Sequence, residues 1–222
     1  MNRRIRGGIR AAGAVMVAGS ASFLTGAFMP VSRVYVEREP QRKLEILLAD
    51  PVQWRAELAF LGAGTIVLPV GVAMLARHWG EDRGLHGLDR PPGRRLAVAG
   101  TVLLAAGAGA FLVDLSARFN DPEGFALGHQ PLWPFHAYMW SSLAGMAALG
   151  GALLREKRRD SGSGIPRWPG WLNLGGAAAF AGVLAGTGDI PPLFVYLVGF
   201  ATGAALILRG RENRSHIFGG SE

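Results

Sequence analysis

Four ionisable side chains stand beside long uncharged stretches of the sequence: Glu57, Asp114, His136 and Asp189. Carboxylates next to an imidazole can bind a divalent cation, or pass a proton between an acid and a base. Ionisable groups near a lipid interior are costly, so those present are functional candidates. In one shared pocket, Glu57 would be the acid/base, His136 its proton partner, and Asp114 and Asp189 the supporting charges. For a metal, Glu57 and His136 would be the ligands.

Asp114 has a ready structural explanation, whereas Glu57 does not. Asp114 and Arg118 are four residues apart, which is the spacing of an ion pair on one helix. Asp50–Pro51 is typical of an N-cap followed by the first helical residue. Glu57 then lies about two turns into the helix, too deep to cap it. Glu57 is therefore the strongest functional candidate.

The other two candidates also have structural explanations. Asp189 precedes Ile190–Pro191–Pro192, an order that resembles an N-cap followed by proline in the first helical turn. His136 follows Pro134 by two residues and could lie among lipid headgroups. Both explanations stay open beside the shared pocket.

Six stretches of low charge must position these residues. Half of the residues are hydrophobic and 18% are charged, with the charge gathered in clusters between long apolar runs. A helix needs about 20 residues to cross a bilayer. The runs are apolar all round and lack strand alternation, so they predict an all-α bundle of membrane helices. The predicted spans are 11–30, 57–77, 95–115, 134–154, 171–187 and 190–209.

The basic residues predict how the six spans are oriented. Seventeen of the 23 Lys and Arg residues fall in the two termini and the links after spans two and four, and six fall in the other links. This positive-inside bias predicts a bacterial inner-membrane protein with both termini in the cytoplasm. The basic pI of about 10.9 is then explained by topology, which argues against a nucleic-acid partner and leaves the lipid bilayer as the first partner.

The first apolar run has a second interpretation. A basic start followed by an apolar stretch is also typical of a cleaved signal peptide, and Arg3–Arg4 loosely fits a twin-arginine signal. The run exceeds the 7–15 residues of a usual signal core, which favours an uncleaved anchor. Cleavage would leave five spans.

The external segment 31–56 is predicted to carry a short interfacial helix. Residues 41–49 place Leu44, Leu47 and Leu48 on one face, which fits a helix lying on the outer leaflet. A solvated connector is the alternative. Tyr35 and Trp54 are expected at the external membrane boundary, where amphipathic rings gather.

Pairs of small residues at four-residue spacing indicate close helix packing: Ser22/Gly26, Gly182/Gly186 and Gly199/Gly203. Such pairs serve contacts within one bundle, or form a face for another membrane protein or a second copy. We expect the first use to be the general one.

The residue types in the sequence argue against several cofactors. The chain has no Cys, which excludes Cys-ligated iron–sulfur clusters. We find no His pair in mid-membrane for haem and no Lys inside a span for a retinal Schiff base. No cofactor is therefore predicted.

Two patches resemble a bacterial family of uncharacterised six-helix inner-membrane proteins. One is Ala49–Trp54, which leads into the second span, and the other runs from Asp189–Phe194 through Gly199 to Arg209–Gly210. The resemblance implies a six-helix bundle and brings no activity, cofactor or site residue.

Two functions follow from these features. The first is a non-enzymatic membrane protein that binds a partner membrane protein or lipid, as an accessory subunit of a complex. The second is a membrane-embedded enzyme, or a carrier of small solutes or cations, with an outward-facing Glu/Asp/His pocket.

Overall fold

The computed structural model describes residues 3–81, 92–155 and 166–218. Within these residues every regular element is a helix, so the all-α prediction is confirmed for the described part of the chain. The elements are α1 (Arg3–Ala27), η1 (Pro30–Tyr35), α2 (Pro40–Ala49), α3 (Pro51–Glu81), α4 (Pro92–Asn120), α5 (Pro122–Ala126), α6 (Trp133–Arg155), α7 (Trp168–Thr187) and α8 (Leu193–Phe218).

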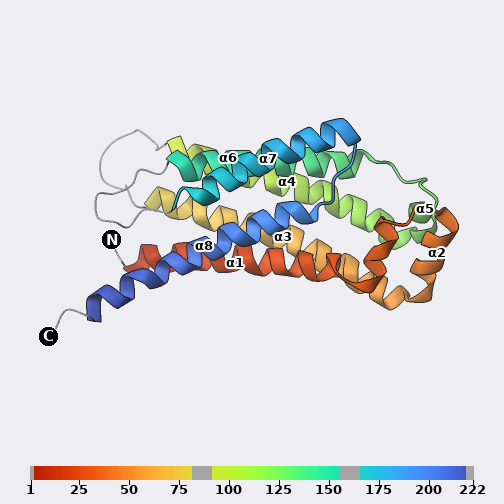
Figure 1. The fold of residues 1–222 in the computed structure, drawn as a ribbon, viewed down its shortest axis with the longest axis horizontal. Helices are drawn as coiled ribbons and strands as arrows, with labels where there is room; N and C mark the ends of the chain where they lie inside the picture. Colours follow the sequence, from red (N-terminus) through yellow and green to blue (C-terminus); the bar gives the residue numbers. More distant parts are fainter. Residues whose placement is uncertain (1–2, 82–91, 156–165, 219–222) are drawn as a thin grey trace.

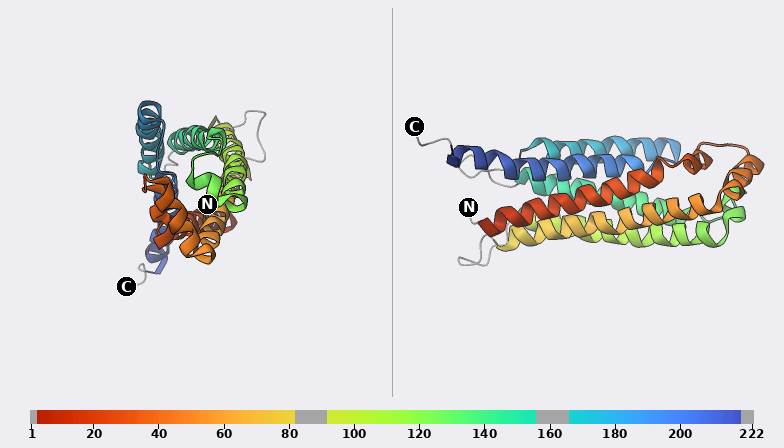
Figure 2. Two further views of the ribbon diagram at one scale, coloured as in Figure 1. Left: turned by 90° about the vertical axis from the view of Figure 1, so that its right-hand side faces the viewer. Right: turned by 90° about the horizontal axis from the view of Figure 1, so that it is seen from below.

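The long helices run side by side along the long axis of the molecule (Figure 1). Helix α1 begins and α8 ends at the same end, which we call the terminal end. The short elements η1, α2 and α5 gather at the opposite end, which we call the cap end (Figure 2). Helix α3 begins at the cap end and α4 finishes there, so the elements bring Glu57 and Asp114 to the same end of the bundle.

Four described helices are long and apolar enough to cross a membrane: Gly7–Ala27, Pro51–His78, Gly93–Asn120 and Trp133–Arg155. Helix α8 adds a shorter apolar stretch, Leu193–Leu208. Helix α7 has 20 residues, carries Asn173 and several glycines, and is not among these four. The chain is therefore a helical membrane bundle with several passes.

Local chemistry sets the boundaries of the elements at the cap end. The Gln53 N–H donates to Asp50 Oδ1 at 2.8 Å, so Asp50 caps α3 as predicted. The Gly124 N–H donates to Asp121 Oδ1, also at 2.8 Å, and caps α5 in the same way. Helix α7 ends at Thr187, and its C-cap residue Gly188 has a φ of 73°, the left-handed conformation that glycine adopts without strain.

The predicted helix in segment 31–56 is present as α2. Leu47 is buried and Leu44 packs against the core, so this side of the helix contacts the rest of the protein. Leu48 remains 64% exposed. The apolar face is thus shared between the bundle and the surroundings.

Glycines let the helix backbones approach closely in the middle of the bundle. A Cβ on Gly64 of α3 would lie 2.6 Å from the Gly19 carbonyl oxygen of α1. A Cβ on Gly13 of α1 would lie 2.7 Å from the Gly203 carbonyl oxygen of α8. Both distances are too short for a real side-chain atom, so these crossings require glycine.

A buried network of hydroxyl groups joins the middle of α3 to the first turns of α6 and α8. The Tyr138 hydroxyl donates to the Tyr196 hydroxyl at 3.0 Å, and the Thr65 and Tyr196 hydroxyl oxygens are 2.7 Å apart. Phe23 stacks on Tyr196 and Phe111 on Tyr138, with ring centroids 3.6 and 4.3 Å apart. Since Thr65 also donates to the Leu61 carbonyl at 2.8 Å, the network has little spare hydrogen-bonding capacity.

Candidate functional site

Asp114 and Arg118 form an ion pair within α4 at the cap end. Arg118 Nη2 lies 2.6 Å from Asp114 Oδ2, and the two side chains are only 11% and 7% exposed. The ion pair predicted from their four-residue spacing is confirmed. Because it is nearly buried, it depends on having both charges present.

Glu57 lies beside this pair without a hydrogen bond of its own. It is fully buried, and neither carboxylate oxygen has a hydrogen-bond partner among the described residues. The hydroxyls of Ser32 and Tyr35 and the Arg118 guanidinium are close enough to act on it. Together Glu57, Asp114 and Arg118 would carry one uncompensated negative charge, and an unpaired charge is costly to bury.

Aromatic rings surround the Arg118 guanidinium. Its central carbon lies 4.7 Å from the Phe125 ring centroid and 5.5 Å from that of Tyr35, which are cation–π distances. Trp54 stacks on Phe125 with centroids 5.6 Å apart. These rings shield the charged groups from solvent. We name Glu57, Asp114, Arg118, Ser32, Tyr35, Trp54 and Phe125 the cap cluster.

Two residues predicted to lie at the external membrane boundary belong to this cluster. Trp54 is 3% exposed and its ring stacks on Phe125 of α5, so it packs within the protein, and its depth in the membrane stays a prediction. Tyr35 exposes 40% of its surface, yet the burial of its hydroxyl end raises the pKa of that group above its ordinary range, while Arg118 acts to lower it.

His136 and Asp189 take other positions. His136 is half-buried near the start of α6, and its ring lies 6.0 Å from that of Phe135. Asp189 is exposed, and its backbone carbonyl accepts a hydrogen bond from the Thr187 hydroxyl at 2.6 Å. Helix α8 begins at Leu193, so Asp189 stands outside the capping position proposed for it.

Metal binding by Glu57 and His136 stays a prediction. In the described part of the chain, no group of three or more His, Asp or Glu side chains could hold a metal ion. The geometry therefore favours Glu57, Asp114 and Arg118 as the centre of the site.

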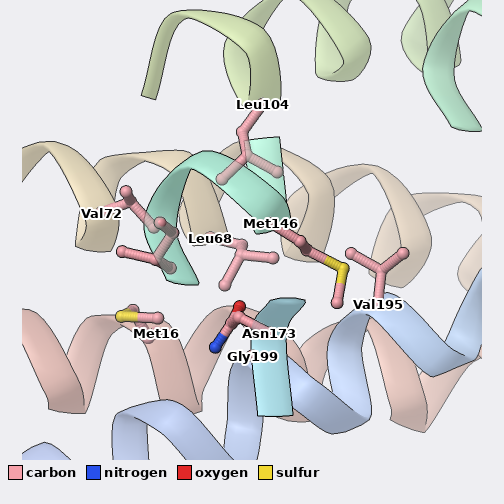
Figure 3. Close-up of a pocket in the computed structure, with 9 residues that line it drawn as sticks. Met16, Leu68, Val72, Leu104, Met146, Asn173, Val195 and Gly199 are labelled. Carbon is pink, nitrogen blue, oxygen red and sulfur yellow. The ribbon is translucent and has the colours of Figure 1, made fainter. Parts of the chain in front are cut away.

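A small cavity lies deeper in the bundle, among α1, α3, α4, α6, α7 and α8 (Figure 3). Its water-sized space is about 10 Å³, enough for a single water molecule at most. The Asn173 side-chain amide lines it and donates to the Thr202 hydroxyl at 2.8 Å, joining α7 to α8. Its lining is otherwise mainly apolar, so this cavity is a packing feature of the bundle.

The three predicted pairs of small residues have two different environments. Gly26 packs against α3, and Gly199 and Gly203 pack against α1 or α3. In contrast, a Cβ added to Gly182 or Gly186 of α7 would meet no atom within 4 Å. The pairs Ser22/Gly26 and Gly199/Gly203 therefore hold the bundle together, and the pair Gly182/Gly186 is left open.

No family model, curated protein or solved structure matches the chain.

Proposed function

We propose that this chain is a non-enzymatic membrane protein that binds a helix of another membrane protein through the open face of α7, as an accessory subunit. The observation that carries this proposal is the small-residue surface of that helix. Gly175, Ala179, Gly182 and Gly186 recur every three or four residues and are all exposed. A Cβ on any of the three glycines would meet no atom within 4 Å.

Small residues on one face let two membrane helices approach closely, where lipid offers no hydrophobic driving force. The glycines in the centre of this bundle serve that purpose between its own helices. The same chemistry on α7, which lies at the edge of the bundle (Figure 2), fits a helix from outside the chain. Lipid chains do not need a glycine face to pack on.

Replacing Gly182 with leucine is expected to abolish the complex without harming the bundle. The new side chain would project from the open face and hold a partner helix away. Affinity purification from mild detergent, followed by mass spectrometry, should recover a partner with the wild-type chain and at least tenfold less with Gly182→Leu.

The matched control is Gly109→Leu on α4, where an added Cβ also meets no atom within 4 Å. This variant should retain the partner. A wild-type chain recovered solely as a monomer, with no other protein, would contradict the proposal. A particle made only of copies of this chain would mean that the face binds a second copy and not another protein.

We further propose that the chain crosses the inner membrane of a bacterium six times, with α7 and α8 as the last two spans. The resemblance to six-helix inner-membrane proteins agrees with this count. The distribution of Lys and Arg supports an orientation with the cap end outside and both termini in the cytoplasm. Helix α1 supplies core residues such as Met16, which supports an anchor that stays attached.

The absence of Cys makes this topology directly testable with single cysteines. A membrane-impermeant maleimide should label Leu48→Cys and Pro191→Cys in intact cells, and Ser161→Cys only after lysis. Labelling of Ser161→Cys in intact cells would reverse the orientation. If Leu48→Cys is labelled from outside and Pro191→Cys is not, the chain has fewer than six spans.

A second candidate function is a membrane-embedded enzyme, or a carrier of small solutes or cations, centred on the cap cluster. The buried, unpartnered Glu57 favours it, since such a group is rarely kept without a use. The two candidates separate by variant. Glu57→Gln should abolish the cellular role under the second candidate and leave it intact under the first.

A further inference from the structure

We propose that the Glu57 carboxyl binds a proton from the solution at the cap end and is the uncharged member of the cap cluster. This inference names the ligand of the second candidate function and rests on the same site. The sequence predicts an acid/base role for Glu57, and this inference adds which form the carboxyl takes in the cap cluster, the protonated one.

The first step of the argument is charge balance. Arg118 is committed to Asp114 at 2.6 Å and is faced by the rings of Phe125 and Tyr35. One guanidinium cannot neutralise two buried carboxylates. One added proton brings Glu57, Asp114 and Arg118 to zero net charge, and Glu57 is the carboxylate without an ionic partner.

The second step concerns the hydroxyl that faces Glu57. Ser32 donates its one hydrogen to the Gly26 carbonyl oxygen at 3.1 Å. With that hydrogen engaged, the Ser32 oxygen can accept the O–H of a protonated Glu57 carboxyl. The bond to Gly26 is therefore compatible with the protonated form.

Arg118 is the positive charge that acts on Glu57, and it is shared with Asp114, its ion-pair partner on α4. The hydroxyls of Ser32 and Tyr35 act on Glu57 as neutral hydrogen-bonding groups. From α1, the Gly26 backbone lies against the Glu57 backbone, where an added Cβ would be 3.0 Å from the Glu57 carbonyl oxygen. No other described group has been found to offset the charge of Glu57.

Infrared spectroscopy of the purified full-length chain in detergent tests the proposal. At neutral pH, the wild-type minus Glu57→Gln difference spectrum should show the C=O band of one protonated carboxyl group per chain. Glu45→Gln removes an exposed glutamate and should leave that band in place. In Asp114→Asn the guanidinium is released to pair with Glu57, so the band should be lost.

Isotope labelling of the glutamate side chains in wild-type protein must shift the same band, which tests the assignment even if Glu57→Gln does not fold. Absence of a glutamate acid band at neutral pH would overturn the proposal. Loss of the band on adding Na⁺ at constant pH would also overturn it, because the ligand would then be a metal cation. Neither result depends on transport or activity, so the second candidate function is judged separately.

Discussion

Replacing Arg118 with glutamine is expected to lower the free energy of unfolding by about 3–5 kcal/mol. The guanidinium is the positive charge between two buried carboxyl groups, and its loss leaves Asp114 as an uncompensated charge. Unfolding of the purified chain in detergent micelles, followed by tryptophan fluorescence, would measure the loss.

Two further variants distinguish the loss of a charge partner from the loss of a long side chain. The double variant Asp114→Asn/Arg118→Gln removes both charges and should recover most of the stability. Arg55→Gln removes an exposed arginine that lies 5.6 Å from the Phe119 ring, and it should cost less than about 1 kcal/mol. Equal losses in Arg118→Gln and Arg55→Gln would contradict the importance of the ion pair.

Replacing Gly64 with valine is expected to prevent recovery of folded protein, and even Gly64→Ala should cost about 1–3 kcal/mol or more. An added Cβ would lie 2.6 Å from both the Gly19 carbonyl oxygen and the Phe23 amide nitrogen. These are backbone atoms of α1, so the only relief is to separate two helices. The measurement is the monodisperse fraction after detergent extraction.

Gly62, two residues earlier on α3, provides the control. A Cβ there would meet Leu112 at 3.5 Å, which is ordinary van der Waals contact. Gly62→Ala should therefore behave like the wild type. A Gly62→Ala loss as large as that of Gly64→Ala would mean that helix propensity, and not the α1–α3 contact, determines the effect.

The elements of this fold were predictable where local chemistry determines them. Asp50–Pro51 marked the start of α3, and α2 appeared as the spacing of its leucines indicated. The charge-free runs mark only the apolar parts of these helices: α3 includes the charged Arg55 and Glu57, and α4 continues through Arg118 to Asn120. The charges of the cap cluster at these ends are paired or buried, so they do not end the helices.

The candidate site was predictable only along single helices. Asp114 and Arg118 are on adjacent turns of α4, and their pairing follows from spacing. Ser32 and Phe125 come to the same site from η1 and α5, because these short elements fold back onto the end of the bundle. Hydrophobic periodicity in the sequence does not predict that arrangement. The small-residue pairs show the same limit: the spacing is alike in all three, and only the neighbouring helices decide which pair is left open.

The contact between Gly13 and Gly203 joins the first long helix of the chain to the last. Ribosomes extend a chain by about 5–20 residues per second, so α8 is made on the order of ten seconds or more after α1. During that interval the glycine surface of α1 that α8 later covers is exposed, and the insertion machinery or a chaperone must shield it. Premature termination before α8 would leave it permanently uncovered, which makes such fragments ready targets for membrane proteases.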